Sequence, residues 1–247
     1  MIWGENKILD KLNLYLSSEE KLAIVGPSGS GKSTILKILA GLILPTEGEL
    51  KIFDKRQNYL RLDQNEPPDV RLVFQNPALL GSLTIEENVG FILNKNKLMP
   101  KKVIKEIVED CLAEVGLYNI SQKLPSELSG GMQKRVSFAR ALIGEQKTNT
   151  KNKPILLFDE PTAGLDPIAS TRIEDLINKT NNKVQGSSIV VSHVLSTIER
   201  TSQRVLMLYG GKFRWEGSIS EFKKTRDPFV LQFREGNLKG PMQPKET

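Results

Sequence analysis

The chain has 247 residues, of which 38% are hydrophobic and 26% charged, so it can bury one large core with a subdomain. No stretch approaches the roughly 18 uninterrupted apolar residues that would cross a bilayer, and MIWGENKILD lacks the pattern of a secretory signal. A single cysteine, Cys111, excludes an internal disulfide and a Cys-based zinc site. The net charge of +6 is spread along the chain and therefore identifies no partner.

The first predicted elements are strands that alternate with helices. Strand-like apolar runs end at polar or glycine-rich points in residues 21–26, 71–75, 154–160 and 187–193. The first run is followed by apolar residues at helical spacing, namely Ile35, Leu36, Ile38, Leu39 and Leu42. Because continuous apolar strands suit a parallel sheet that is covered on both faces, the sequence predicts an α/β core.

Between the second and third strands lies a long segment, residues 76–135, without a convincing strand. Its apolar residues near 100–116 have helical spacing, and Cys111 among them is expected to be a buried small hydrophobe. We interpret this segment as a helical insertion in the core. Two polar stretches, residues 60–69 and 145–153, are predicted to be solvated loops.

The C-terminal region begins with a predicted hairpin over residues 204–217, with Gly210 and Gly211 at its turn. A short helix is expected near 218–225. The tail that follows carries four large apolar residues within five positions: Phe229, Val230, Leu231 and Phe233. This apolar surface must be covered, either by the protein's own core or by a partner.

The strongest motif is GPSGSGKS, which lies between a predicted strand and a predicted helix, as the phosphate-loop pattern requires. Gly29 and Gly31 leave room for backbone N–H groups to converge on phosphate oxygens. Lys32 can neutralise the β- and γ-phosphates, and the Ser33 hydroxyl can bind magnesium. The predicted ATP-binding residues of this loop are Gly26, Pro27, Ser28, Gly29, Ser30, Gly31, Lys32, Ser33 and Thr34.

A second motif, ILLFDE, places two acids at the end of a buried strand, where open α/β sheets bind ligands. Asp159 would hold magnesium through its water shell. Glu160 points elsewhere and could activate the attacking water as a general base. An apolar run that ends in Asp-Glu is common by itself, so this interpretation depends on the phosphate loop.

A third motif, LSGGMQ, opens the predicted helix MQKRVSFARALI. Ser129, Gly130 and Gly131 at a helix start form another phosphate cradle. One nucleotide does not need two full cradles, so this one is expected to serve a nucleotide that another copy of the chain holds.

The order and spacing of GPSGSGKS, Gln75, LSGGMQ, LLFDEP, AGLD and His193 resemble the ABC ATPase family over nearly the whole chain. The resemblance implies two cassettes packed head to tail, with each ATP between the phosphate loop of one and the LSGGMQ cradle of the other. It adds Gln133 and Gln75 to the ATP-binding residues, and Gln75 also as a magnesium ligand that faces the membrane partner. It further implies that Asp166 reaches the opposing site and that His193 contacts the γ-phosphate.

The lone His193 could instead be a structural residue, and the adenine-stacking aromatic matches only Trp3, near the start of the sequence. The family places a strand before that aromatic. Either such a strand lies upstream of Met1, or this protein lacks it. A partly buried terminal aromatic is the alternative for Trp3.

A narrower resemblance links the chain to the ATPases of MCE-type lipid transporters, the Mla systems and their cyanobacterial and chloroplast relatives. It is carried by LTIEENVGFIL, SGGMQKRVSFARAL, DEPTAGLDPIAST and the tail DPFVLQFREGNLKGPMQ. This resemblance favours docking of the tail on the partner cassette.

Together these features predict a P-loop NTPase of the RecA-like α/β type, with a mostly parallel sheet, a β subdomain and an inserted helical subdomain. Residues 1–75 and 136–224 would form the ATP-binding core, 76–135 the helical subdomain with the LSGGMQ motif, and 225–247 a C-terminal extension.

The predicted function is ATP hydrolysis that powers lipid transport, with ATP and Mg²⁺ bound and with Glu160, His193 and Lys32 as catalytic residues. The expected partners are a second, identical cassette, an integral membrane permease and an MCE-type lipid-binding protein, with no nucleic acid. The chain would lie peripherally at the cytoplasmic or stromal face of the inner or plasma membrane. Importer motors for an amino acid or a metal, and ABC ATPases of chromosomes or ribosomes, are the alternatives.

Overall fold

The central feature of the computed structural model, which describes residues 1–3, 6–95, 99–143 and 153–243, is a six-stranded sheet. The strand order is β10-β9-β3-β8-β7-β6, in which the first pair is antiparallel and the other pairs are parallel. The strands are β3 (Lys21–Val25), β6 (Val70–Val73), β7 (Ile155–Asp159), β8 (Ser187–Val191), β9 (Arg204–Tyr209) and β10 (Lys212–Ser218). The predicted mostly parallel sheet and its C-terminal hairpin are confirmed.

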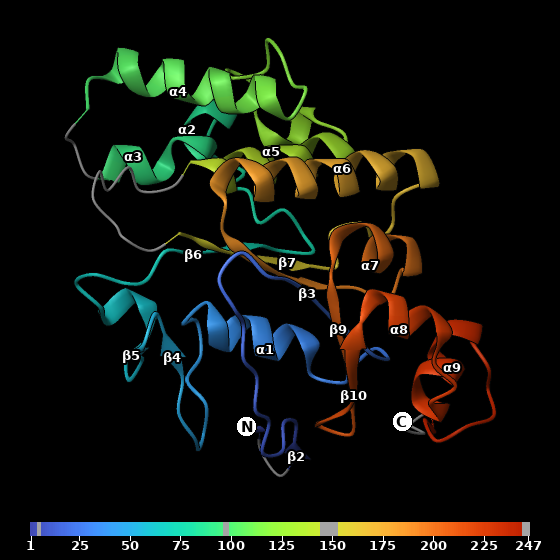
Figure 1. Cartoon of the computed structure of the whole chain (residues 1–247). Helices are drawn as coiled ribbons and strands as arrows, with labels where there is room; N and C mark the ends of the chain where they lie inside the picture. The colour runs from blue at the N-terminus through green and yellow to red at the C-terminus, as the bar shows by residue number, and fades with distance from the viewer. Residues whose placement is uncertain (4–5, 96–98, 144–152, 244–247) are drawn as a thin grey trace.

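Alternate residues of β3 point to opposite faces of the sheet, as strand geometry requires. Leu22 and Ile24 pack with helix α1 (Lys32–Leu39) on one face, where they share a buried cluster with Leu36. Ala23 and Val25 face the other side. Figure 1 shows α1 on one side of the sheet, with α5 and α6 on the opposite side.

The second layer consists of α5 (Gly130–Leu142) and α6 (Pro167–Val184). The rings of Phe138 from α5 and Phe158 from β7 stack with centroids 5.4 Å apart, and both side chains are fully buried. This contact attaches the α5 helix directly to the strand that ends at Asp159.

The described residues between 76 and 135 contain helices and no strand, as predicted. These helices are α2 (Ile85–Val89), α3 (Phe91–Lys95), α4 (Lys101–Glu114), the 3₁₀ turn η2 (Pro125–Glu127) and the start of α5. Thr84 begins α2 with a reciprocal capping box to Glu87. The division at residues 75, 135 and 225 stays a prediction, and α5 runs through the boundary at 135.

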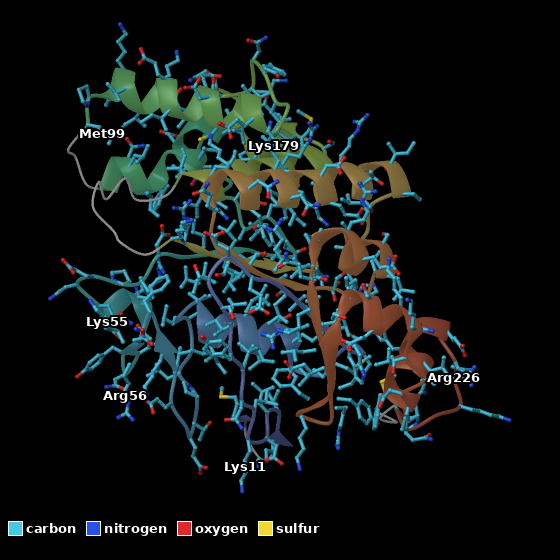
Figure 2. The ribbon with its side chains drawn as sticks, in the orientation of Figure 1. Lys11, Lys55, Arg56, Met99, Lys179 and Arg226 are labelled. Atoms are coloured by element: carbon cyan, nitrogen blue, oxygen red, sulfur yellow. The ribbon has the colours of Figure 1, made fainter. Side chains whose placement is uncertain are left out.

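Two small antiparallel ribbons flank the core. They are β1 (Ile2–Trp3) with β2 (Asn6–Lys7), and β4 (Lys51–Ile52) with β5 (Lys55–Arg56). Figure 2 shows Lys55 and Arg56 at the outer edge of the molecule. The predicted loop at 60–69 contains one 3₁₀ turn, η1 (Arg61–Asp63), and the predicted loop at 145–153 lies outside the described residues except for Lys153.

The C-terminal helices α7 (Leu195–Thr201), α8 (Ile219–Lys224) and α9 (Pro228–Glu235) pack beside the sheet. Val230 of α9 and Phe222 of α8 are fully buried in one cluster with Val25 and Met207. Part of the tail therefore folds back onto the protein's own core, which is one of the two alternatives. Docking of the tail on a partner cassette stays a prediction. The part of the chain that the structure describes has no helix long and apolar enough to cross a membrane.

Candidate functional site

The candidate residues gather where four neighbouring parallel strands end. Asp159 of β7 is in register with Val191 of β8, and Val191 is in register with Ile24 of β3. The phosphate loop follows β3, His193 follows β8, and Asp159 and Glu160 end and follow β7. Gln75 follows β6, at the edge of the sheet. The strand order thus brings together segments that are far apart in sequence.

The backbone of the phosphate loop is held against other parts of the chain at two glycines. Gly26 has φ of 151°, and a Cβ atom on it would lie 2.2 Å from the Leu208 carbonyl oxygen. Gly31 has φ of 100°, and its Cβ would lie 2.8 Å from the Leu9 side chain. Contacts within the protein therefore exclude a side chain at Gly26 and at Gly31. Gly29 has open space around it among the described residues, and it fits the predicted role of leaving room for phosphate.

Polar groups inside the loop lack partners that an anion would supply. Gly31 precedes α1 with no side-chain cap, and the first turn carries no acid, so the positive helix end stays uncompensated. The Ser30 Oγ atom is buried, and the part of the chain that the structure describes gives it no hydrogen-bond partner. These orphaned donors fit a bound phosphate group. Ser28 and Gly29 lie exposed at the tip of the loop, and Thr34 is half-buried in α1.

Lys32 is buried, and its Nζ atom donates to the carbonyl oxygens of Gly26 and Pro27, each at 2.9 Å. Burial lowers the pKa of this ammonium group, while the carboxylates of Glu160 and Asp159 raise it. The charge lies inside the loop with two neutral acceptors, from which it can turn to an anion.

A candidate magnesium site lies between α1 and β7. The Ser33 hydroxyl donates to Asp159 Oδ1 at 2.9 Å, across 126 positions of sequence. Burial raises the pKa of the Asp159 carboxyl, and the Ser33 hydrogen bond lowers it. A partly buried carboxylate beside a hydroxyl is an oxygen donor set that suits a divalent cation. Gln75 is exposed, and the backbone after it is fixed by Arg140, which donates to the carbonyls of Pro77 and Ala78.

Glu160 and His193 form a direct pair. The Glu160 Oε2 atom lies 2.9 Å from His193 Nδ1 and accepts from the His193 backbone N–H at 3.4 Å. The Glu160 side chain is only 10% exposed, whereas the imidazole of His193 is 59% exposed. Its second nitrogen therefore remains available to another group. Glu160 also has φ of 45°, a conformation that non-glycine residues adopt rarely.

Sequence reasoning missed a buried polar network that connects the segments after these two residues. The Thr162 hydroxyl bonds the Thr197 hydroxyl at 2.8 Å, and Thr197 donates to Glu174 Oε1 at 2.9 Å. Glu174 is 1% exposed, and Arg200 pairs with its other oxygen at 2.9 Å. No spacing in the sequence brings these residues together, because α6 and α7 meet only in the folded chain.

The LSGGMQ cradle lies at the start of α5, on the opposite side of the sheet from α1 (Figure 1). Ser129 caps the helix by accepting from the Met132 N–H at 3.3 Å. Gln133 donates to the carbonyls of Pro125 and Leu128, so its amide nitrogen holds the cradle's own backbone. A Cβ atom on Gly130 or Gly131 would meet nothing within 4 Å.

The last two predicted site residues, Asp166 and Trp3, lie at the start of α6 and in strand β1. Asp166 is the N-cap of α6, where its Oδ1 atom accepts from the backbone N–H groups of Ile168 and Ala169. That carboxylate oxygen therefore stabilises its own helix. Trp3 belongs to strand β1, and its side chain lies outside the described part of the structure.

Comparison with known proteins gives the family. The family model for the ABC transporter matches residues 9–163. The chain is 45% identical over 251 residues to Protein TRIGALACTOSYLDIACYLGLYCEROL 3, chloroplastic, of Arabidopsis thaliana, covering 98% of this chain and 73% of that relative. It is 35% identical over 244 residues to the intermembrane phospholipid transport system ATP-binding protein MlaF of Haemophilus influenzae, covering 97% and 89% of the two chains.

Among solved structures, the dimeric post-hydrolysis state of the ATP-binding cassette MJ0796, bound to ADP and Pi, is 31% identical with a TM-score of 0.75. The match covers 89% of this chain and 94% of that one. The family match, the sheet order and the motifs at the strand ends agree. The chain belongs to the ABC transporter family and is an ATPase cassette of that family.

Proposed function

We propose that the chain binds ATP and Mg²⁺ as one half of a head-to-tail pair of identical cassettes, and that hydrolysis in this pair drives lipid transport. The observation that carries the pairing is the second cradle. No described residue requires Gly130 and Gly131 to lack side chains, since both have open space where a Cβ would lie. A ligand from outside the chain therefore accounts for them best.

In the proposed reaction, a water oxygen bonds to the γ-phosphorus and the bond to the bridging oxygen breaks, which yields ADP and inorganic phosphate. Glu160 accepts the proton of that water. The ammonium of Lys32 donates hydrogen bonds to the phosphoryl oxygens as negative charge develops there. Because Nδ1 of His193 faces the Glu160 carboxylate, the exposed nitrogen of His193 donates to these oxygens in the imidazolium form, in which both ring nitrogens carry a proton.

Ser33 and Asp159 are the residues that would hold Mg²⁺, with Gln75 as a further ligand from the adjacent strand. When bound, the ion supplies positive charge to the β- and γ-phosphate oxygens. The existing Ser33–Asp159 hydrogen bond keeps the two oxygen donors close, so little rearrangement of either side chain is needed.

Lipid is the proposed cargo because of the relatives. MlaF is named as the ATP-binding protein of an intermembrane phospholipid transport system, and the 45% identical Arabidopsis protein is named after a galactolipid. On this proposal the cassette works with an integral membrane permease and an MCE-type lipid-binding protein. It would lie peripherally on the cytoplasmic or stromal face of the membrane.

Complementation between two inactive variants tests the paired arrangement. Lys32→Ala removes the ammonium of the phosphate loop, and Ser129→Arg fills the second cradle with a bulky cation. Each variant alone should lose ATP hydrolysis. A mixture forms dimers in which one of the two composite sites has both an intact Lys32 and an intact Ser129, so hydrolysis should return in part.

Ser129→Asn is the control, because asparagine keeps the helix cap and carries no charge. ATP hydrolysis by Ser129→Arg alone at the wild-type rate, or no recovery in a mixture shown to contain mixed dimers, would refute the composite site.

A further inference from the structure

Lys134 lies on α5 just beyond the LSGGMQ cradle and contacts the backbone of another segment of the chain. Its Nζ atom donates to the Ala163 carbonyl oxygen at 2.5 Å and lies 3.5 Å from the Pro161 carbonyl oxygen. Both carbonyls belong to the turn that directly follows Glu160. The side chain therefore connects the cradle helix with the backbone that carries the general base.

The turn that Lys134 contacts is held by a hydrogen bond to β8 at its start and by hydrogen bonds within itself. At its start, the Glu160 N–H donates to the Val191 carbonyl on β8 at 2.9 Å. Within it, the N–H groups of Ala163 and Leu165 donate to the Glu160 and Thr162 carbonyls. Two backbone N–H groups of the turn therefore have acceptors within it, while Lys134 of α5 contacts the Pro161 and Ala163 carbonyl oxygens.

Charge makes this contact stronger than an ordinary loop hydrogen bond. In the described structure, backbone oxygens are the hydrogen-bond acceptors of the Lys134 ammonium group. Burial lowers the pKa of this group, and the nearby Glu160 carboxylate raises it. Hydrogen bonds from a charged donor are roughly twice as strong as neutral ones. Glu160 holds a positive φ, and such a conformation persists only where its surroundings fix it.

We propose that Lys134 is a positioning residue for hydrolysis, which couples the cradle at Ser129–Gly131 to the general base Glu160 of the same chain. The proposal rests on the paired arrangement described above. In that pair, the cradle of one chain contacts the nucleotide held by the other. Engagement of that nucleotide would set the position of α5, and Lys134 would transmit it to the turn after Glu160. Hydrolysis at one site would then depend on the nucleotide at the other.

Three variants of the full-length protein test the coupling. Lys134→Met removes the ammonium but keeps an apolar stem of similar length, and it should lower kcat for ATP hydrolysis roughly tenfold or more. The KM for ATP should change little, because Lys134 does not contact the phosphate loop. The Hill coefficient for ATP should fall to about one. Lys134→Arg, which keeps a charged donor, should restore most of the rate.

Lys179→Met is the matched control. Lys179, labelled in Figure 2, also joins two helices through a backbone carbonyl. Its Nζ atom on α6 donates to the Glu114 carbonyl of α4 at 3.4 Å, which lies outside the turn after Glu160. This variant should keep kcat and the Hill coefficient within about twofold of the wild type. A fall of similar size in both variants would overturn the proposal.

Mixed dimers, purified with two different tags, distinguish loss of Glu160 positioning from a general destabilisation of the protein by Lys134→Met. One chain carries Glu160→Gln, so only the other chain hydrolyses ATP. Lys134→Met in the hydrolysing chain should slow the reaction roughly tenfold or more. The same change in the Glu160→Gln chain should leave the rate within about twofold, since it can only position an inactive residue.

If ATP hydrolysis is equally fast or equally slow with Lys134→Met in either chain of the mixed dimer, Lys134 does not position Glu160 of its own chain. A wild-type protein that forms no ATP-dependent dimer would instead refute the paired arrangement itself. Wild-type cooperativity that survives in Lys134→Met would refute only the coupling through this residue.

Discussion

At Glu160, the backbone and the side chain have separate partners that together fix the direction of the carboxylate. The backbone N–H bonds to β8, and Oε2 contacts both the ring and the backbone of His193. Neither partner is near Glu160 in sequence. Its neighbour Asp159 contacts Ser33 instead, so two adjacent acids are directed to different tasks.

Glu160→Gln should therefore keep ATP binding and lose turnover by about 10²–10⁴-fold, the usual contribution of a general base. Glutamine retains the shape and can still accept from His193, so the fold of the site should not change. The measurement is steady-state ATP hydrolysis together with an ATP-binding titration. With ATP, this variant should accumulate as a dimer on size exclusion.

Glu106→Gln on the exposed face of α4 is the control for this substitution, and it should hydrolyse ATP at the wild-type rate. Near-normal turnover by Glu160→Gln would remove Glu160 from the role of general base.

At the scale of elements, helix α9 is fixed by a cap at each end and by contacts of its Phe229 ring. Asp227 caps the helix by accepting from the Phe229 and Val230 N–H groups, and Gly236 ends it with φ of 62°. The Phe229 ring lies beside Tyr209 and under the Arg214 guanidinium, with centroid distances of 5.7 Å in both contacts. The helix is thus anchored to the β9–β10 hairpin of its own chain.

Val230→Ala should lower the free energy of unfolding of the monomer by about 1–3 kcal/mol, because it removes fully buried methyl groups. Urea denaturation monitored by circular dichroism gives this value. Leu238→Ala is the control, since Leu238 is 86% exposed and its truncation should change stability by less than about 0.5 kcal/mol.

Truncation after Thr225 extends this test to the whole tail. It should lower the melting temperature of the monomer, because Phe222 loses its cover. If truncation instead left the monomer's melting temperature unchanged and weakened dimers in sedimentation, the tail would act mainly between cassettes.

At the scale of the whole molecule, helices cover both faces of the sheet, with α1 on one side and α5 and α6 on the other. The helical layer is joined to the core by Arg140, which binds the backbone after Gln75, and by the Phe138–Phe158 stack. A change at the nucleotide site can reach the helical layer by these contacts. That layer is the part expected to face a permease.

Purification of the tagged cassette from its native membranes should recover a permease and an MCE-type protein, identified by mass spectrometry. ATP hydrolysis by this complex in phospholipid vesicles should be accompanied by lipid transfer, which a fluorescent phospholipid reports. The complex with Glu160→Gln is the control and should transfer no lipid. Recovery of a soluble amino-acid-binding protein with the permease would favour the importer alternative instead.

The sequence by itself determined features that depend on neighbours along the chain. The phosphate loop, the acids at the end of β7, the cap of α5 at Ser129 and the hairpin turn at Gly210 are all set by local spacing. Because side-chain periodicity and turn chemistry act over a few residues, the strands of the central sheet and helices such as α1, α4, α5 and α8 could be located from sequence alone. The short strands β1, β2, β4 and β5 were not predicted.

Only the tertiary structure decided which of these features meet. The placement of β3 between β8 and β9 brings Ser33 to Asp159 and packs Gly26 against Leu208. It also decided that Val230 is covered by its own core, and that Lys134 reaches the turn after Glu160. The physical reason is that a sequence pattern shows which apolar side chains of a helix or strand must be buried. Strand order and helix packing decide which other part of the chain covers them.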